Sequence, residues 1–300
     1  MSSKNLGHLR LIIFFTVIIY LLSFITPNTD LEILNINILQ FVLFYVWIVQ
    51  IIGFIFGFIY QTERYYDFIG SLTYSSSTLI IYFSLPAKSL TDSILLILVL
   101  IWSLRLGLFL FRRILEDGHD TRFDKPKQSF FHFLQYWTGQ AMWVSFTCIA
   151  VYVAMISQEN NALSTVSLIG LFIWVAGFVI EVVSDSQKRN FRKDLNNKGR
   201  FISTGLWSRS RHPNYFGEIT LWVGISVISL SSLSGIGYVA LISPFFVYAL
   251  LSKGSGIPLL ERSADKKWGN ESDYQEYKKG TPVLFPKLFN NIKQSNDNGN

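Results

Sequence analysis

DSILLILVLIWSLRLGLFLF, residues 92–111, is a run of apolar side chains interrupted by only Asp92 and Arg105 among charged residues. A helix of about 20 apolar residues spans the roughly 30 Å hydrocarbon core of a bilayer. Similar runs recur along the chain, and 50% of its 300 residues are hydrophobic whereas 15% are charged. The sequence therefore predicts an all-α, polytopic membrane helix bundle and argues against ordinary water-soluble domains.

The apolar runs predict about eight transmembrane helices and set the expected organisation of the chain. They cover roughly residues 11–26, 36–60, 68–85, 92–111, 131–156, 163–184, 215–231 and 236–251. Because only the Ser/Gly-rich stretch SLSSLSGIG separates the last two, a single broken segment or a re-entrant pair is an alternative. We expect N-terminal transmembrane helices in 1–62, the main membrane domain in 63–287 and a disordered polar tail in 288–300.

The positions of the basic residues predict the orientation of the helices. With both termini in the cytosol, all of the 26 Lys and Arg residues except Lys88 and Arg105 lie near the inner ends of the spans. This agrees with the positive-inside rule and predicts a cytosolic cap. The first span follows basic residues but lacks a small-x-small cleavage site, so we expect a retained signal anchor. The endoplasmic reticulum is the default membrane for a eukaryotic source.

Several classes of function are disfavoured by what the sequence contains. The net charge of +6 suits contact with anionic lipid headgroups, and no basic, aromatic-interleaved stretch indicates nucleic acid. Cys148 is the single cysteine and lies in an apolar run, which predicts a packing role. The histidines are scattered, no metal site is expected, and GxGxxG, P-loop and GxSxG motifs are absent. Any cofactor is therefore expected to be organic and held by helix ends and loops.

A polar face is predicted at the end of the sixth span. Glu181, Asp185, Arg189 and Arg192 follow one another at helical spacing, which places two carboxylates and then two guanidiniums on one face. One interpretation is a ladder of ion pairs between neighbouring turns. The other is a binding site, because guanidinium groups bind phosphate or carboxylate and a neighbouring carboxylate accepts hydrogen bonds from ribose hydroxyls.

The stretch SRSRHPNYFGE, residues 208–218, is the strongest functional signal. Pro213 favours the first turn of a helix, and Asn214, Gly217 and Glu218 then share a face of that helix. The two arginines of the motif precede the helix N-terminus, where free amide groups favour anions. Arginines and an interfacial tyrosine are also ordinary at a membrane boundary. The convergence of five polar residue types within eight positions favours a functional site.

Arg105 is the charged residue expected deepest in the membrane. An intramembrane charge is costly when unpaired, so it indicates either a functional group or an ion pair between helices. Glu181 or Asp67 is the expected partner. Glu63 and Asp67, four residues apart at the end of the second span, are weaker candidates for function.

The chain resembles membrane reductases related to steroid 5-alpha-reductase, in the subgroup called domain of unknown function 1295. The resemblance covers most of the chain beyond the first two spans and extends to sterol C=C reductases. The shorter RHPxYxG core recurs in isoprenylcysteine carboxyl methyltransferases. The matching segments are YYDFIGSLTY (65–74), WSLRLGLFLFRR (102–113), SDSQKRNFRKD (184–194), GLWSRSRHPNYFGE (205–218), SGIPLLE (255–261) and YQEYKKGTP (274–282).

This resemblance implies a cofactor site that opens to the cytosol and an NADPH-dependent oxidoreductase. Tyr215 and Glu218 are the implied catalytic residues, and Glu63, Asp67 and Tyr74 are candidates for polarising a substrate carbonyl. The implied cofactor-binding residues are Asp185, Arg189, Arg192, Arg211, His212, Asn214 and Tyr215.

The implied reaction is reduction of a C=C bond, conjugated to a carbonyl, in a lipid or steroid-like substrate from the bilayer. Arginines suit the phosphates of NADPH and favour it over S-adenosylmethionine, which has no phosphate. Two alternatives stay open: a methyltransferase that uses S-adenosylmethionine on a lipid or prenylated carboxylate, and a non-catalytic lipid-binding membrane protein.

Overall fold

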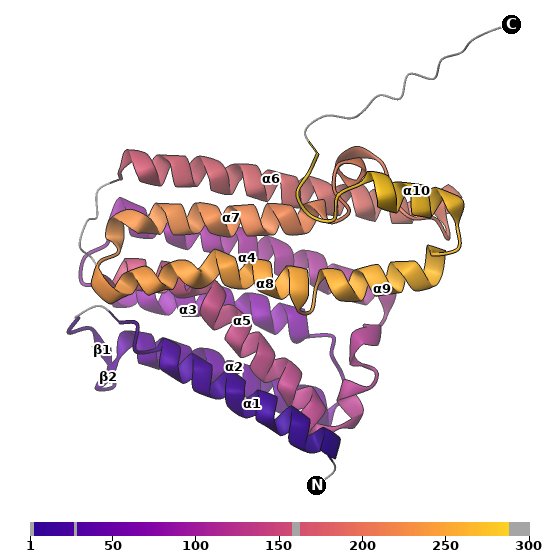
Figure 1. Cartoon of the computed structure of the whole chain (residues 1–300). Helices are drawn as coiled ribbons and strands as arrows, with labels where there is room; N and C mark the ends of the chain where they lie inside the picture. The colour runs from indigo at the N-terminus through magenta and orange to yellow at the C-terminus, as the bar shows by residue number, and fades with distance from the viewer. Residues whose placement is uncertain (1–2, 27–28, 158–162, 288–300) are drawn as a thin grey trace, which may run out of the picture. The chain divides into compact units, whose positions relative to one another are not determined.

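The computed structural model describes residues 3–26, 29–157 and 163–287, and these residues are predominantly helical (Figure 1). The α-helices are α1 (Ser3–Leu22), α2 (Ile38–Ile59), α3 (Tyr66–Ser84), α4 (Leu90–Asp117), α5 (Phe130–Ser157), α6 (Thr165–Lys193), α7 (Pro213–Ser229), α8 (Ser243–Lys253), α9 (Ile257–Trp268) and α10 (Ser272–Gly280). The 3-10 helices are η1 (Thr121–Phe123), η2 (Pro126–Gln128), η3 (Leu195–Asn197), η4 (Gly205–Ser208), η5 (Leu230–Ser232) and η6 (Gly235–Ile242). A two-stranded antiparallel hairpin, β1 (Glu32–Ile33) and β2 (Ile36–Asn37), joins α1 to α2.

The prediction of an all-α polytopic membrane bundle is confirmed. Within the described residues, seven helical segments are long and apolar enough to cross a membrane. Two of them combine shorter elements: residues 213–232 contain α7 and η5, and residues 235–268 contain η6, α8 and α9. The stretch SLSSLSGIG therefore separates two candidate spans. The predicted tail, residues 288–300, lies outside the described residues.

Helix α3 corresponds to the third expected span but is not among these seven. Its many hydroxyl side chains lower its hydropathy, and several of them bond to carbonyl oxygens of the preceding turn. The Oγ1 atoms of Thr73 and Thr78 donate to the backbone oxygens of Ile69 and Tyr74 at 2.7 and 2.8 Å. Because the hydroxyls are satisfied within the helix, a polar composition is compatible with a buried helix.

The described helices divide into two compact units. Unit 1 comprises residues 1–172 and 222–247, and unit 2 comprises residues 173–221 and 248–300. In unit 1, α5 is central: it contacts α1, α2 and α3, and its residues 144–156 are buried. Tyr74, Trp102 and Trp222 meet in the core of this unit, with Trp102 edge-on to both other rings. Such edge-to-face contacts suit the charge distribution of aromatic rings.

In unit 2, helices α6 and α7 approach each other closely at glycines. A Cβ atom on Gly217 would lie 2.6 Å from the backbone nitrogen of Glu181 and 2.7 Å from the carbonyl oxygen of Gly177. Neither backbone atom can move without displacing its helix. The absence of a side chain at Gly217 therefore sets the distance between the helices that carry the predicted polar residues.

Replacing Gly217 by valine is expected to lower the free energy of unfolding by at least about 1–3 kcal/mol, the usual cost of overpacking. The measurement is the thermal midpoint of the protein in mild detergent. Gly280→Ala is the matched control, because a Cβ there meets nothing within 4 Å. Equal midpoints for Gly217→Val and the control would contradict the close packing of α6 and α7.

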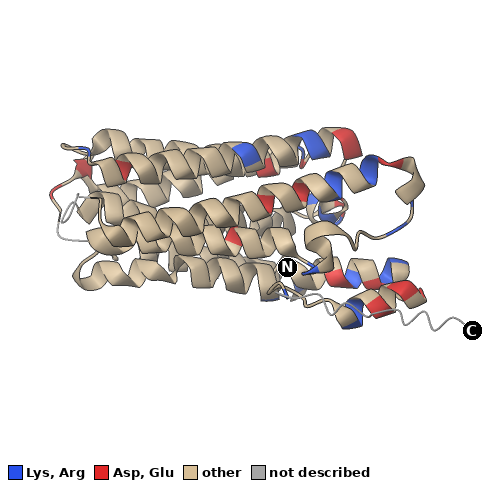
Figure 2. Ribbon diagram, turned by 90° about the horizontal axis from the view of Figure 1, so that it is seen from above, with Lys and Arg blue, Asp and Glu red and all other residues tan. Residues whose placement is uncertain are grey.

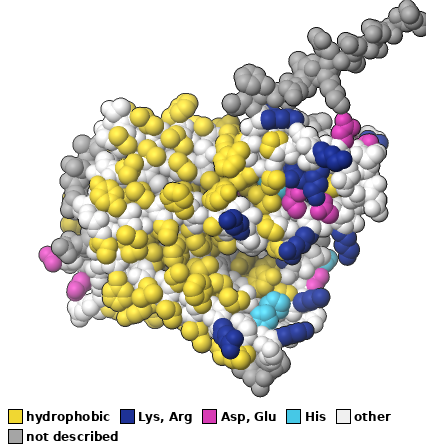
Figure 3. Space-filling view, viewed as in Figure 1, with side chains coloured by type: hydrophobic (Ala, Val, Ile, Leu, Met, Phe, Trp, Pro, Cys, Tyr) yellow, Lys and Arg dark blue, Asp and Glu magenta, His cyan; other side chains and the backbone are white. Residues whose placement is uncertain are grey.

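The surface of the helices is apolar over most of their length. Phe14, Phe172 and Phe245 are 54%, 75% and 72% exposed, as expected for side chains that face lipid rather than water. On the face drawn in Figure 3, hydrophobic side chains cover the helices of each unit and charged side chains gather toward one end of them. Figure 2 shows many of the charged residues of unit 2 along α9, α10 and the C-terminal half of α6.

Candidate functional site

The polar face predicted on α6 lies against the start of α7. Glu181 and Asp185 on α6 are 2% and 7% exposed, and Glu218 on α7 is 6% exposed. The Asn214 side-chain nitrogen donates a hydrogen bond of 3.3 Å to Asp185 Oδ1. The two stretches that the sequence singled out are thus brought together by the packing of α6 on α7.

The loop before α7 is anchored on α6 through η4. Gly205 adopts a positive φ of 62°, which favours glycine. Next to it, Gln187 Oε1 accepts a hydrogen bond from the Leu206 backbone nitrogen at 2.9 Å. The indole nitrogen of buried Trp207 donates to the Ser184 carbonyl at 3.0 Å, and the Lys188 ammonium lies 4.5 Å from the centre of the Trp207 ring. These contacts fix the backbone that leads into the RHPNY motif.

Residues 281–287, here called the C-terminal strap, hold the other side of this loop. Arg211 donates its backbone N–H to the Pro282 carbonyl at 2.9 Å, and Ser210 Oγ donates to the Leu284 carbonyl at 2.8 Å. The Tyr277 hydroxyl, on α10, donates to the Trp207 carbonyl at 2.7 Å. The loop from Trp207 to Arg211 is therefore held by the strap and by α10, which are far away in the sequence.

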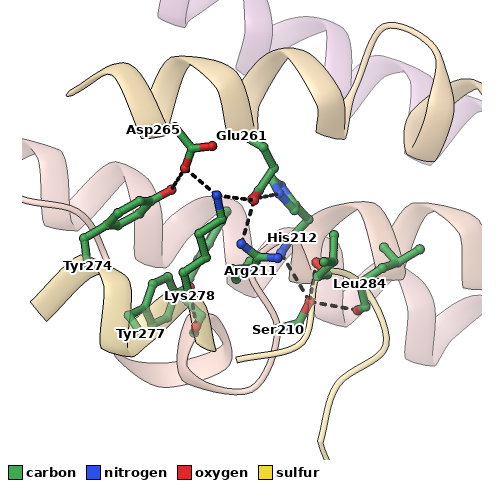
Figure 4. Close-up of polar contacts among 11 residues, drawn as sticks. Ser210, Arg211, His212, Glu261, Asp265, Tyr274, Tyr277, Lys278 and Leu284 are labelled. Carbon is green, nitrogen blue, oxygen red and sulfur yellow. Dashed lines mark hydrogen bonds and ion pairs between the residues drawn. The ribbon is translucent and has the colours of Figure 1, made fainter. Parts of the chain in front are cut away.

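Glu261 of α9 bridges the two central residues of the motif, as Figure 4 shows. Its Oε2 accepts a hydrogen bond of 2.6 Å from Arg211 Nη1, and its Oε1 lies 2.9 Å from His212 Nε2. The Lys278 ammonium is 4.0 Å from Oε2. One carboxylate on α9 thus holds a guanidinium and an imidazole side by side.

Arg211 and His212 each keep one buried nitrogen that has no hydrogen-bond partner among the described residues. These atoms are Arg211 Nε and His212 Nδ1. The His212 side chain is 6% exposed and that of Arg211 is 10% exposed. Leaving a buried polar atom unsatisfied costs roughly 1–3 kcal/mol. A site with two such atoms on neighbouring residues has the character of a binding site that a ligand completes.

The protonation state of His212 follows from its surroundings. Burial lowers the pKa of His212 below its ordinary value, although the hydrogen bond with Glu261 acts in the opposite direction. The nearby charges of Lys188 and Arg211 lower the pKa further. The imidazole is therefore neutral at pH 7. Since a carboxylate only accepts hydrogen bonds, the proton lies on Nε2 and Nδ1 carries a lone pair.

This depressed pKa predicts that acid destabilises the fold through His212. The unfolded chain binds a proton at its ordinary pKa of about 6.5, whereas the folded chain binds it only at lower pH. The contribution of His212 to the free energy of unfolding is therefore fully present above about pH 6.5. It decreases as the pH falls toward the pKa of the folded state, by at most about 1.4 kcal/mol per pH unit. Thermal midpoints from pH 7.5 to 5 should fall less steeply in His212→Gln than in the wild type. Parallel curves would contradict this prediction.

A second polar group on α9 and α10 lies beside Glu261. Asp265 Oδ1 accepts from Lys278 Nζ at 2.5 Å and from the Tyr274 hydroxyl at 3.3 Å. Burial, together with the charges of Glu261 and Asp265, raises the pKa of Tyr274 to about 12. These contacts join α9 to α10 and support the helix from which Glu261 projects.

The remaining predicted residues differ in their exposure. Tyr215 stacks on His212, with ring centres 5.7 Å apart and planes inclined by 13°. Arg189 is half-buried, whereas Arg192, in the last turn of α6, is exposed. Arg192 thus lies at the surface of unit 2, and Tyr215 belongs to the group around Arg211.

In unit 1, the carboxylates considered for polarising a substrate are engaged in ion pairs. The carboxylate of Glu63, a residue that is 5% exposed, accepts from Lys127 Nζ at 2.5 Å and from the Asp120 backbone nitrogen at 3.0 Å. Burial raises the pKa of Glu63, but these hydrogen bonds outweigh it and hold the pKa below its usual value. Asp67 lies 3.7 Å from an Arg122 nitrogen and 3.9 Å from one of Arg113. These contacts indicate a structural role for both residues.

The sequence interpretation gave no role to Glu261, Lys278 or Tyr277. All three lie in segments that carried the family resemblance, SGIPLLE and YQEYKKGTP. Glu261 is the one carboxylate of the first segment, and this is the signal that could have identified it. Its partners are 49 and 50 residues away, a pairing that helical spacing does not reveal.

Apolar spanning helices and a buried polar group at a helix N-terminus define an integral membrane protein with a candidate binding site for a polar or anionic group. Comparison with known proteins then gives the family. Residues 53–281 match the family model described as "Protein of unknown function (DUF1295)". The chain belongs to this family.

Curated relatives include steroid reductases. The chain is 31% identical over 122 residues to "3-oxo-5-alpha-steroid 4-dehydrogenase 1" of Macaca fascicularis, which covers 41% of each chain. It is 30% identical over 124 residues to "Steroid 5-alpha-reductase DET2" of Arabidopsis thaliana, covering 41% of this chain and 42% of the relative. It is also 31% identical over 123 residues to "Probable O-methyltransferase ustE" of Ustilaginoidea virens, with 41% of each chain covered.

The extent of these similarities is limited. The chain spans about two fifths of the length of the curated relatives it matches. No solved structure matches the chain significantly. The match over residues 53–281 shows the family, and the partial matches show that the chain is similar to proteins named as steroid 5-alpha-reductases.

Proposed function

We propose that this protein is an NADPH-dependent membrane oxidoreductase that reduces a carbonyl-conjugated C=C bond in a lipid or steroid-like substrate. The observation that carries the proposal is the pair of buried, unsatisfied nitrogens, Arg211 Nε and His212 Nδ1, in the RHPNY motif. A guanidinium donor suits a phosphate oxygen, and an imidazole acceptor suits a ribose hydroxyl or an amide N–H. Both groups occur in NADPH, so the residues fit this cofactor.

Different residues of the chain bind the cofactor and donate the proton. Arg211, Arg189 and Arg192 bind phosphate oxygens, and Asp185, held by Asn214, accepts from ribose hydroxyls. NADPH supplies the hydride when bound. Tyr215 or Glu218 donates a hydrogen bond or a proton to the substrate. The apolar helix surfaces admit a substrate from the bilayer, and because Glu218 is buried, water has little access to it.

The second candidate function is methyl transfer from S-adenosylmethionine to a lipid or prenylated carboxylate. The relative named as a probable O-methyltransferase favours it. The same two nitrogens suit this ligand, because its carboxylate accepts from a guanidinium and its ribose hydroxyls donate to an imidazole. The exposed Arg192, which suits an additional phosphate, favours NADPH.

Direct binding measurements distinguish these functions. NADPH and S-adenosylmethionine are titrated side by side into the protein in mild detergent and followed by calorimetry. Binding of NADPH is the expected result. Binding of S-adenosylmethionine alone would replace the proposal by the methyltransferase. Binding of neither would favour a lipid-binding membrane protein without this chemistry.

Arg192→Ala tests whether this side chain recognises the 2′-phosphate of NADPH. We expect the variant to weaken NADPH by about tenfold and to leave NADH nearly unchanged, because one charge-assisted hydrogen bond is worth about 1.4 kcal/mol or more. Arg200→Ala, which removes another exposed arginine from the same unit, is the control. Equal losses for the two nucleotides would remove Arg192 from this role.

We also propose that the site faces the cytosol, with both chain termini on that side of an endoplasmic reticulum membrane. The gathering of Lys and Arg near the inner ends of the expected spans supports this orientation. Single cysteines introduced at Lys88 and at Arg200, in a Cys148→Ala background, test it with a membrane-impermeant thiol reagent. Labelling of intact microsomes at position 88 rather than 200 would reverse the orientation.

A further inference from the structure

We propose that Glu261 is a positioning residue that sets the hydrogen-bonding pattern of the site. Glu261 fixes His212 as the tautomer with its proton on Nε2, and it orients the Arg211 guanidinium. His212 Nδ1 then accepts and Arg211 Nε donates, and we call this pair of atoms the joint receptor. The joint receptor binds one ligand group in which an anionic oxygen lies beside a neutral O–H or N–H donor. The identity of the ligand rests on the proposed function, whereas the tautomer does not.

The first step of the argument is the division of one carboxylate between two partners. Oε2 of Glu261 binds Arg211 Nη1 at 2.6 Å, and Oε1 lies 2.9 Å from His212 Nε2 (Figure 4). A carboxylate that pairs with a guanidinium is ionised and only accepts hydrogen bonds. The nitrogen that faces it must therefore carry a proton, and the tautomer of His212 follows from the position of Glu261.

The second step concerns the nitrogens that face away from Glu261. In this tautomer His212 Nδ1 is a pure acceptor, and Arg211 Nε is a pure donor. Both are buried and have no partner in the part of the chain that the structure describes. A single anion without a proton, such as sulfate, satisfies the donor only. A sugar hydroxyl next to a phosphate or carboxylate satisfies both.

The third step is the rigidity of the group. The backbone nitrogens of Arg211 and His212 are bound by the Pro282 carbonyl at 2.9 Å and by Ser210 Oγ at 3.2 Å. Glu261 itself has Lys278 4.0 Å from Oε2. Because backbone and carboxylate are both held, the imidazole cannot turn to exchange its nitrogens without losing the bond to Glu261. The tautomer of His212 thus depends on Glu261, and a substitution of Glu261 can test this dependence.

The test is nitrogen NMR of the detergent-solubilised protein with 15N-labelled histidine rings. The chain has four histidines, and His212→Gln assigns the signals of His212. In the wild type at pH 7.5 we expect a neutral ring protonated on Nε2. Glu261→Gln has one oxygen for two donors. Because the Arg211 guanidinium only donates, it should take the amide oxygen and leave the amide NH2 facing His212 Nε2, which favours the Nδ1-protonated form. Glu261→Leu should give a mixture of the two tautomers. Asp265→Asn, four residues further along α9, is the matched control and should behave as the wild type.

The outcomes distinguish the positioning role of Glu261 from the proposed function. A wild-type His212 that carries its proton on Nδ1, or an Nε2 tautomer that persists in Glu261→Leu, would overturn the role of Glu261. If Glu261→Leu does not fold, the wild-type and Glu261→Gln spectra still decide the matter. A proton on Nδ1 in the wild type, or a ring that stays protonated on Nε2 alone in Glu261→Gln, excludes the role of Glu261.

Addition of NADPH or S-adenosylmethionine should move the Nδ1 signal, and sulfate, which only accepts hydrogen bonds, should not. A nucleotide that binds by calorimetry without moving Nδ1 overturns the joint receptor and leaves the proposed function standing. If neither nucleotide binds but Glu261→Leu still changes the tautomer, the proposed function fails and the positioning role is supported.

Discussion

Arg211→Ala is expected to weaken NADPH binding at least about 100-fold, which corresponds to about 2.7 kcal/mol. The guanidinium is 10% exposed, bonded to Glu261 and left with one buried donor for a ligand. Truncating one partner of a buried, charge-assisted contact usually costs about 2–5 kcal/mol, part of which is the penalty of leaving the other charge unpaired. The dissociation constant, measured by calorimetry in detergent, is the readout.

Two variants separate loss of the binding group from loss of the fold. Arg211→Lys keeps the positive charge near Glu261 but lacks the planar fork, so it should retain the thermal midpoint better than the binding affinity. Arg200→Ala removes an exposed arginine elsewhere and should change neither quantity. Wild-type affinity in Arg211→Ala would exclude the RHPNY motif from the cofactor site.

Lys127→Met is expected to lower the free energy of unfolding by about 3–5 kcal/mol, the effect of removing one partner of a buried ion pair. Glu63 is 5% exposed, and Lys127 lies 2.5 Å from its carboxylate. Without Lys127 the carboxylate would keep the hydrogen bond from the Asp120 backbone N–H and would remain buried. The thermal midpoint in detergent measures the loss.

The double variant Glu63→Gln with Lys127→Met is the decisive control. A neutral amide tolerates burial better than a carboxylate, so the second change should recover much of the stability lost in Lys127→Met. Cofactor binding should be the same in both variants if Glu63 is structural. Recovery of no stability would mean that Lys127 acts through contacts other than its pair with Glu63.

The helices were predictable from the sequence because lipid imposes a simple requirement. A run such as 92–111 must form a helix when its backbone groups have no water to bond. The third expected span coincides with helix α3, although this helix is less apolar than the seven candidate spans. Its hydroxyl side chains bond to the helix backbone and make a polar sequence compatible with burial. Hydropathy alone does not include that local compensation.

The candidate site was predictable only in part. Helical spacing placed Glu181 and Asp185 on one face, and the proline of RHPNY marked the start of α7. The contact of Asn214 with Asp185 agrees with a shared site. Glu261 was missed because its pairing with Arg211 depends on how α9 packs in unit 2, and no periodic pattern in the sequence encodes a contact 50 residues away.

The sequence order of the bridging contacts has a consequence for biosynthesis. A ribosome completes Arg211 and His212 about 50 residues before it reaches Glu261, and Ser210 precedes its partner Leu284 by 74 residues. Until α9 and the strap emerge, the nascent chain holds an unpaired arginine at the start of a membrane helix. The group of Arg211, His212 and Glu261 can therefore form only late in synthesis, and a chain terminated before position 261 lacks the carboxylate that joins the other two residues.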